Sequence, residues 1–256
     1  MSPTVPEGIP HRLIRHVSVD STNEQALLAV AAGSARHGDV HLAEEQTAGR
    51  GRLGRSWASP PGAGLYASLI LLPEPTPPPP ETLTVAAGLA VVATVDDLGA
   101  RGARLRWPND VLVAGAKLAG ILVETRGLDP RAPHFVIGIG LNVRHHDLPA
   151  QVLGGRIVTS LEALGVSAEP EAVLGLLLEH LDRRLAQSLT SAAALAQEFL
   201  ERTCLADAPV SVRHGNETTS GVLRELDWKK GLLLDCPDGE ARRVALPLVR
   251  AVEPLD

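Results

Sequence analysis

The chain has 256 residues, a formal net charge of −6 at pH 7 and a hydrophobic content of 45%. This length fits one large domain, or one domain with a small second one, and the hydrophobic content is ample for a core. The acidic balance argues against a general polyanion-binding protein, and an aromatic content of only 2% argues against stacking platforms for single-stranded nucleic acid.

The N-terminal sequence has no apolar segment of the signal-peptide type, and no apolar run is long enough to span a bilayer. Cys204 and Cys236 are far apart and fit no metal or redox spacing, so we expect two buried, reduced thiols. These features predict a cytoplasmic protein that does not associate with membranes.

Strands and helices are both expected in the first hundred residues. A helix should start at Ser21, which has capping-box spacing with Glu24, and stop at Gly33. Further expected elements are a strand at 40–45, a Gly/Arg-rich loop, an apolar strand at 65–72, a stiff proline-rich connector at 73–80 and a buried helix at 82–98.

The next region has the pattern of short strands followed by helices. A strand at 104–106 ends at Trp107-Pro108, residues 111–123 are typical of a hairpin, and residues 135–143 form another strand. That strand contains Gly138 and Gly140, where a ligand can come close to the backbone. From 159 to 202 the pattern is helical, with breaks near Pro170 and Thr190.

After Asp207 the pattern changes to short strand-like pieces separated by turns such as Lys230-Gly231 and Asp238-Gly239. About five such strands in so short a segment suggest a small barrel. We therefore divide the chain into domains 1–206 and 207–256. The expected strands are 210–213, 221–226, 232–235, 242–246 and 249–252.

The most informative stretch is 49–57, Gly-Arg-Gly-Arg-Leu-Gly-Arg-Ser-Trp. Glycine lets the backbone approach a ligand, and arginine offers a planar fork of donors that suits carboxylate and phosphate. The stretch lacks the Gly-Lys-Ser/Thr of a Walker loop and the spacing of a dinucleotide fingerprint. A disordered Gly/Arg segment that touches RNA is the alternative, but there is one copy only, between apolar segments. We expect a loop that holds a small anion.

Polar residues also interrupt apolar strands elsewhere. Lys117 is either a strand-end lysine whose ammonium reaches solvent or a fixed cation that faces a site. Asp110, next to Asn109, is either part of an ordinary turn or a ligand of Mg²⁺. Together with Arg50 and Arg52, these residues suit a nucleoside triphosphate and an acidic substrate.

Signatures of covalent catalysis are missing from the sequence, which has neither a Gly-x-Ser-x-Gly elbow nor a cysteine nucleophile motif. His145-His146-Asp147 is expected to be an exposed loop rather than a metal site, because no other ligand spacing accompanies it. The chemistry is therefore expected to depend on positioning and electrostatics.

In order and spacing, the motifs resemble those of the biotin protein ligases, also called biotin–[acetyl-CoA-carboxylase] ligases. The resemblance covers roughly residues 12–253, and the Gly/Arg stretch is its most specific part. The matching blocks are 20–23, 45–57, 106–110, 117–124 and 137–143.

The resemblance implies a two-step reaction. Biotin and MgATP give biotinyl-5'-AMP and pyrophosphate, and a lysine of a biotin carboxyl carrier domain then takes the biotinyl group and releases AMP. It also implies an α+β fold, in which a mixed sheet flanked by helices is related to class II aminoacyl-tRNA synthetases. A small SH3-like β-barrel is expected at the C-terminus.

The family's site residues carry over onto matching positions. Lys117 and Arg52 are the expected catalytic residues, and Asp110 is the expected Mg²⁺ ligand. The expected biotin-binding residues are Ser21, Thr22, Asn23, Gln46, Arg50, Gly51, Arg52, Lys117, Gly120 and Gly138. The expected ATP-binding residues are Arg52, Arg55, Trp57, Asn109, Lys117 and Asn142.

Some family members carry an N-terminal winged helix-turn-helix and repress transcription. Here the first matching motif starts near Ser21, so we expect no specific DNA binding. A homodimer is expected, because dimers are common in the family. The rivals are a lipoate or octanoate transferase, which would lack the Gly/Arg stretch, a non-catalytic biotin sensor or repressor, and an SH3-like interaction module with an inactive catalytic domain. Intact Arg52 and Lys117 count against the last of these.

Overall fold

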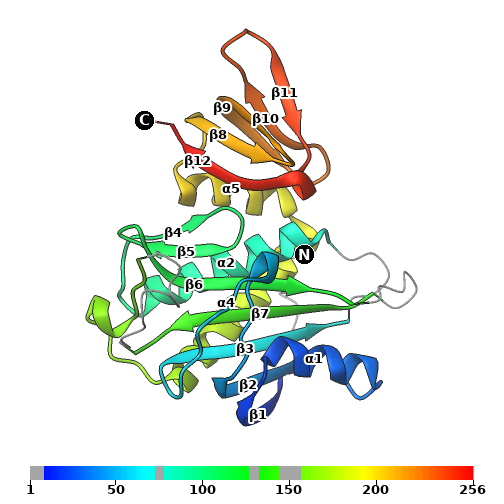
Figure 1. Cartoon of the computed structure of the whole chain (residues 1–256), viewed down its shortest axis with the longest axis vertical. Coiled ribbons are helices and arrows are strands. Elements are labelled where there is room, and N and C mark those ends of the chain that lie inside the picture. The colour runs from blue at the N-terminus through cyan, green and yellow to red at the C-terminus, as the bar shows by residue number, and fades with distance from the viewer. Residues whose placement is uncertain (1–8, 73–77, 127–132, 145–156, 256) are drawn as a thin grey trace, which may run out of the picture.

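The protein is described here from a computed structural model, which covers residues 9–72, 78–126, 133–144 and 157–255. The His145-His146-Asp147 segment and most of the proline-rich connector lie outside these residues. In Figure 1 the described chain forms two sheets, a larger one flanked by helices and a smaller one at the end of the molecule that carries the C-terminus.

The larger sheet has seven strands in the order β1-β2-β3-β7-β6-β5-β4. Strands β1 and β2 are parallel, and every other neighbouring pair is antiparallel. The strands are β1 (Arg12–Val19), β2 (Asp39–Gln46), β3 (Gly64–Leu71), β4 (Ala103–Arg106), β5 (Asp110–Val113), β6 (Ala116–Glu124) and β7 (Phe135–Asn142). This is the mixed sheet of an α+β fold, as the sequence predicted.

Helices cover both faces of this sheet. Helix α1 (Thr22–Ala31) lies on one face, and α2 (Pro80–Asp97) and α4 (Pro170–Thr190) lie on the other (Figure 1). Strand β3 is buried along its whole length because it serves both layers. Its Ile70 packs with Ala26 and Leu27 of α1, whereas its alternate residues join the large core of α2.

The smaller sheet has five antiparallel strands in the order β11-β10-β9-β8-β12. Helix α5 (Ala192–Thr203) lies between the two sheets (Figure 1). A hydrogen bond also joins them, from Trp107 Nε1 to the Val249 carbonyl at 3.4 Å. The strands are β8 (Pro209–His214), β9 (Glu217–Asp227), β10 (Gly231–Asp235), β11 (Ala241–Val244) and β12 (Val249–Pro254).

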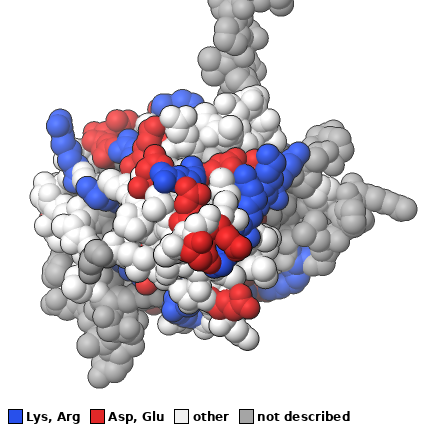
Figure 2. Space-filling model, turned by 90° about the horizontal axis from the view of Figure 1, so that it is seen from above, with Lys and Arg blue, Asp and Glu red and all other residues white. Residues whose placement is uncertain are grey.

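The end of the molecule that carries the smaller sheet presents charges of both signs. Figure 2 shows basic and acidic side chains interspersed on this face. Arg224, for example, pairs with Asp207 and Asp235, both at 2.7 Å. Alternating charges of this kind form a solvated surface, not a basic patch for a polyanion. In the described part of the chain, no helix is both long enough and apolar enough to cross a membrane.

Three expectations from the sequence were wrong in detail. Strand β1 was missed, because it is an edge strand whose residues are mostly part-exposed and show no clean alternation. Ser21 does precede α1, but no side-chain capping bond forms there, since Glu24 pairs with arginines instead. Cys204 is exposed, and only Cys236 is buried; both are free thiols.

Candidate active site

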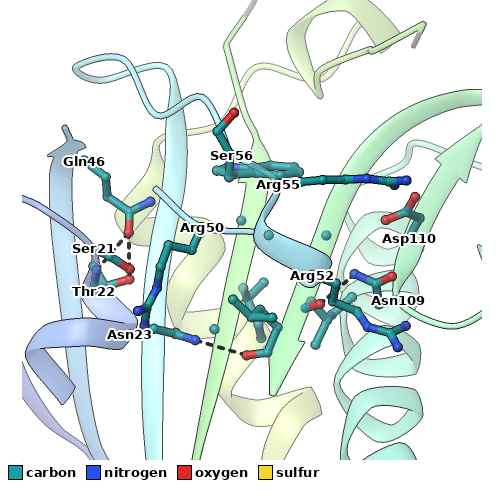
Figure 3. A pocket seen from close by; sticks show the side chains of 18 of the residues that line it. Ser21, Thr22, Asn23, Gln46, Arg50, Arg52, Arg55, Ser56, Asn109 and Asp110 are labelled. Atoms are coloured by element: carbon teal, nitrogen blue, oxygen red, sulfur yellow. Dashed lines mark hydrogen bonds between the residues drawn. The ribbon is translucent and has the colours of Figure 1, made fainter. Parts of the chain in front are cut away.

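A cavity of about 550 Å³ opens on the α1 face of the larger sheet, beneath the Gly/Arg loop. Figure 3 shows Ser21, Thr22, Asn23 and Gln46 on one side of it and Arg52, Asn109 and Asp110 on the other. Every site residue predicted from the sequence lines this cavity except Asn142. The lining residues are Ser21, Thr22, Asn23, Gln46, Arg50, Gly51, Arg52, Gly54, Arg55, Ser56, Trp57, Asn109, Asp110, Lys117, Gly120, Ile121, Leu122, Gly138, Ile139 and Gly140.

One end of the cavity carries uncharged polar side chains held in fixed orientations. The backbone nitrogen and hydroxyl of Thr22 lie 2.8 and 3.1 Å from Gln46 Oε1, to which both donate. Gln46 Nε2 donates in turn to Ser59 Oγ at 2.6 Å. Since both ends of the Gln46 amide are engaged, its orientation is set before any ligand arrives.

Asn23 is fixed in the same way, next to a glycine that makes room for it. Its Oδ1 lies 2.5 Å from Ser68 Oγ, and its Nδ2 donates to the Leu122 carbonyl and, at 2.8 Å, to Glu124 Oε2. A Cβ atom at Gly138 would collide with the Asn23 amide. The glycine noticed in the β7 sequence therefore admits a side chain of the protein, not only a ligand.

The other end of the cavity is built on the Trp57 ring. This ring lies against Gly120 and Gly140, where a Cβ at Gly140 would be 2.5 Å from Trp57 Cε2. The Lys117 ammonium stands 5.0 Å from the ring centroid, a cation–π contact, and pairs with Asp110 at 2.7 Å.

Two alternatives left by the sequence are thus decided. The Lys117 side chain is 12% exposed and the Asp110 side chain 13%, so the ammonium is a fixed cation that faces the cavity, not one that reaches into solvent. Asp110 begins β5 and points a carboxylate into the site, so it is more than a turn residue.

The Gly/Arg loop is a tight structure that closes on itself. Gly51 N donates to the Arg55 carbonyl at 2.6 Å, and Trp57 N donates to the Gly49 carbonyl at 2.8 Å. At its tip Leu53 adopts a left-handed conformation with φ 57°, and its side chain is 70% exposed. The loop thereby directs Arg50 and Arg52 towards the sheet while its apolar tip faces solvent.

The two arginines have different surroundings. Arg50 donates from Nη1 to Glu24 at 2.8 Å and from Nη2 to Glu124 at 2.9 Å. Arg52 makes no side-chain hydrogen bond or ion pair with any residue that the structure describes. Burial lowers the pKa of the Arg52 guanidinium, while Glu81 and Asp110 act in the opposite direction. A desolvated cation without a partner is suited to an incoming anion.

Of three further predicted residues, two have structural partners. Asn109 Nδ2 donates to the Ile121 carbonyl at 2.9 Å, which fixes the turn before Asp110. Asn142 Nδ2 donates to the Thr159 carbonyl at 2.9 Å and lies behind Lys117, outside the cavity lining. Arg55 lines the cavity and makes no side-chain bond within the described residues. Their contacts with a nucleotide stay predictions.

Sequence reasoning gave no role to several residues that shape the site. Glu24 was interpreted as a helix-capping residue, and Glu124 ended a matching block without an assignment. Ser59 supports Gln46 and Ser68 supports Asn23, but these partners lie 13 and 45 positions away in the chain. Only the unusual acidic end of the apolar β6 strand could have drawn attention to Glu124.

Comparisons with known proteins agree with this geometry. The model of the biotin/lipoate A/B protein ligase family matches residues 16–142. A biotin–[acetyl-CoA-carboxylase] ligase from Mycobacterium tuberculosis is 37% identical over 221 residues, which are 84% of this chain and 80% of that protein. This chain belongs to the biotin protein ligase family.

Two further family members extend the comparison. A bifunctional ligase/repressor from Escherichia coli is 35% identical over 85% of this chain and 67% of that protein. The structure of the biotin protein ligase from Aquifex aeolicus in complex with biotin and ATP is 26% identical and has a TM-score of 0.79. That alignment covers 95% of this chain and 99% of the Aquifex chain, so the likeness includes both sheets.

Proposed function

We propose that this protein uses ATP to attach biotin to one lysine of a biotin carboxyl carrier domain, through biotinyl-5'-AMP. The observation that carries the proposal is the single cavity that joins a neutral polar end to a cationic end under a glycine-rich loop. A ligand with an uncharged polar ring and a carboxylate fits this polarity, and a nucleotide fits beside it.

Each substrate has a proposed position in the cavity. The fixed amides and hydroxyls of Gln46, Thr22, Ser21 and Asn23 would bind the ureido group of biotin, because neutral donors and acceptors suit a neutral ring. The biotin carboxylate would then point towards Arg52 and Lys117. The adenine would lie near Trp57, and Arg55, Asn109 and Asn142 are proposed as further nucleotide contacts.

The first chemical step brings two anions together. A carboxylate oxygen of biotin attacks the α-phosphorus of ATP, a mixed anhydride forms and pyrophosphate leaves. Fixed cations at Arg52 and Lys117 would offset the repulsion, and they act most strongly where charge shifts during the transfer. Because the Lys117 side chain is largely buried and Arg52 is part-buried, water screens their attraction for the phosphate less than at an exposed site.

In the second step a carrier lysine, as the neutral amine, attacks the biotinyl carbonyl. An amide bond forms, AMP leaves with the electron pair of the broken anhydride bond, and the amine releases a proton. The intermediate is sensitive to water, so the Gly/Arg loop is proposed to cover it between the steps. Lys117 would hold the phosphate oxygens of the leaving AMP.

Magnesium is proposed to arrive with ATP. No group of three or more His, Cys, Asp or Glu residues in the described chain could form a protein cage for a metal ion. Asp110 is the one carboxylate that lines the cavity as described, and Mg²⁺ commonly takes one or two carboxylates together with phosphate oxygens. Asp110 therefore fits a metal ion that offsets negative charge on the triphosphate.

Finer features of the molecule stay proposals as well. We propose that the larger unit, 1–206, is related to class II aminoacyl-tRNA synthetases and that the second unit, 207–256, is an SH3-like barrel. Its five antiparallel strands support the second description. A homodimer, the absence of specific DNA binding and a cytoplasmic location stay predictions from the sequence.

A lipoate or octanoate transferase is the main competing enzyme, since the matching family model includes lipoate ligases. The Gly/Arg loop and the cationic end of the cavity favour biotin activation by ATP. A non-catalytic sensor would not need Arg52 and Lys117 beside the place where the biotin carboxylate and the phosphate form the mixed anhydride.

The test is to incubate the protein with biotin, MgATP and a biotin carboxyl carrier domain and to measure the carrier's mass. We expect a gain of one biotinyl group on a single lysine, and no gain without ATP. Parallel reactions with lipoate and octanoate serve as controls. A carrier modified by lipoate but not by biotin would contradict the proposed substrate.

A further inference from the structure

An ionic cluster joins the Gly/Arg loop to α1 and to the end of β6. We infer that Arg50 anchors the loop through its two terminal nitrogens, and that Glu24 and Glu124 are positioning residues that hold it. We call Glu24, Arg50 and Glu124 the loop clasp. This inference rests on the proposed function only where it concerns the effect of bound biotin on the loop.

The geometry assigns both ends of the Arg50 guanidinium to protein carboxylates. Nη1 reaches Glu24 on α1 at 2.8 Å, and Nη2 reaches Glu124 at the end of β6 at 2.9 Å. These three side chains are between 21% and 32% exposed, so the clasp is sheltered from water. Each terminal nitrogen of Arg50 thus donates to a different carboxylate, while its buried Nε has no hydrogen-bond partner in the described chain.

The division of roles between the two arginines follows from this contrast. Arg50 and Arg52 are two residues apart on one loop, yet Arg50 is bound at both ends and Arg52 is bound to no described side chain. The expected contact of Arg50 with biotin stays a prediction, and the anchoring role is added to it. Arg50 fixes the position of the loop, and Arg52 supplies the charge that meets the ligand.

Glu124 also connects the clasp to the polar end of the cavity. Its Oε2 accepts from Arg50 Nη2 at 2.9 Å and from Asn23 Nδ2 at 2.8 Å. Asn23 is the residue proposed to bind biotin, so one oxygen atom receives hydrogen bonds from both the ligand-binding end and the loop. A ligand that contacts Asn23 joins this network, further restrains Glu124 and stabilises the closed loop.

Glu24 has a different second partner. Arg126 donates to both of its carboxylate oxygens at 2.8 Å, and the hydrogen bond and charge of Arg126, together with Arg50, keep the pKa of Glu24 below its usual value. Among the described residues Arg126 makes no hydrogen bond or ion pair with the loop, and it keeps Glu24 charged and oriented towards Arg50. Glu24 therefore holds the loop whether or not a ligand is present, whereas Glu124 couples the binding of biotin at Asn23 to the closure of the loop.

Trypsin cleavage after Arg52 or Arg55 measures loop opening directly and needs no ligand. The experiment compares the full-length protein with Glu24→Gln, Glu124→Gln and the double variant, and mass spectrometry identifies the cut. The matched control is Glu198→Gln, because Arg184–Glu198 is a comparably sheltered pair, 19% and 25% exposed, between α4 and α5. Circular dichroism checks that all variants are folded.

In the protein without ligand, each single variant should be cut about threefold faster and the double variant about tenfold faster, since cleavage follows the open population. Raising the salt concentration should speed cleavage of the wild type but hardly affect the double variant. Glu198→Gln should behave as the wild type. Equal cleavage rates for the double variant and the wild type would overturn the clasp.

Addition of biotin separates the two glutamates. Biotin should protect the wild type and Glu24→Gln by similar factors, and Glu124→Gln by a much smaller factor. If biotin protected Glu124→Gln from trypsin as well as it protects the wild type, Glu124 would not couple biotin binding to loop closure. If biotin protects no protein, including the wild type, the proposed function fails, while the comparison without ligand still decides whether the clasp holds the loop.

Discussion

At the scale of single residues, the cations of the site differ in whether other side chains restrain them. Arg50 is held by two carboxylates, and Lys117 is held by Asp110 and the face of Trp57. Arg52 alone among these three has no partner in the described chain. The sequence predicted all three as site residues because their types and spacing are visible in it. Their separate roles depend on partners up to 74 positions away, which no local pattern reveals.

Arg52→Gln removes the unpaired charge while it keeps the length of the side chain. We expect biotinyl-AMP to dissociate about 30- to 100-fold faster, which corresponds to the loss of one hydrogen bond to a charged group. Stopped-flow dissociation of the intermediate measures the rate. Arg104→Gln, on the exposed face of β4, is the control and should leave the rate unchanged. An Arg52→Gln protein with wild-type retention would remove Arg52 from ligand binding.

Lys117→Ala leaves the Asp110 carboxylate without its counter-charge beside the reacting phosphate. The rate of adenylate formation should fall about 10²- to 10³-fold, as for loss of one preorganised charge stabiliser. Pyrophosphate exchange into ATP gives the rate, and the circular dichroism spectrum should stay that of the wild type. If exchange continued at the wild-type rate, Lys117 would have no part in the first step.

At the scale of elements, β7 divides the cavity by means of two glycines on one face of the strand. Gly138 makes room for Asn23, and Gly140 makes room for the Trp57 ring. The sequence showed that something approaches this strand closely, but it did not show that protein side chains do so. The reason is that α1, the Gly/Arg loop and β7 meet only in the folded sheet.

Substitution of these two glycines should therefore affect the two substrates separately. Gly138→Ala displaces the Asn23 amide and should raise the KM for biotin, whereas Gly140→Ala displaces Trp57 and should raise the KM for ATP. We expect increases of about tenfold, the effect of about 1.4 kcal/mol of lost binding. Steady-state kinetics with each substrate varied in turn give both constants.

Gly175→Ala is the matched control for this pair. Gly175 lies on the exposed side of α4, and an added Cβ would meet nothing within 4 Å. Alanine there should raise the free energy of unfolding by about 0.5–1 kcal/mol without changing either KM. The account of β7 would be wrong if the two site variants changed both KM values equally.

At the scale of the whole molecule, the sequence predicted most of the helices and strands and the change of pattern after Asp207. The apolar residues on nearly every side of α2 and the apolar runs of the inner strands made these elements visible, because they are buried in a continuous core. The edge strand β1 was not visible, since its residues satisfy the parallel pairing with β2 without forming an apolar face. How the helices cover the sheet and where the second sheet lies both depend on contacts between residues far apart in the chain.

The β1–β2 edge also makes overall stability sensitive to acid. Burial, and then the charge of His16, lower the pKa of His41 to about 4, so His41 is neutral in the folded protein at neutral pH. An unfolded histidine has a pKa of about 6.5. Between these values the unfolded state binds more protons, so the free energy of unfolding falls as the pH falls from about 6.5 to about 4.

His41→Gln should remove this part of the pH dependence, which amounts to at most about 3 kcal/mol. Urea unfolding at pH 7.5 and at pH 4.5 measures it for the variant and the wild type. His11 acts in the opposite sense, because Asp182 outweighs the effect of burial and raises its pKa, but its contribution is the same in both proteins. Equal acid sensitivity of the variant and the wild type would contradict a neutral, buried His41.

The measurement that tests the whole account most directly is the isolation of the intermediate. The protein is mixed with biotin and MgATP without a carrier, passed through a desalting column, and its bound small molecules are identified by mass. We predict about one equivalent of biotinyl-5'-AMP per protein chain, which disappears when a carrier domain is added and biotin appears on the carrier lysine. Biotinylation of the carrier in a reaction that never yields protein-bound adenylate would contradict the account.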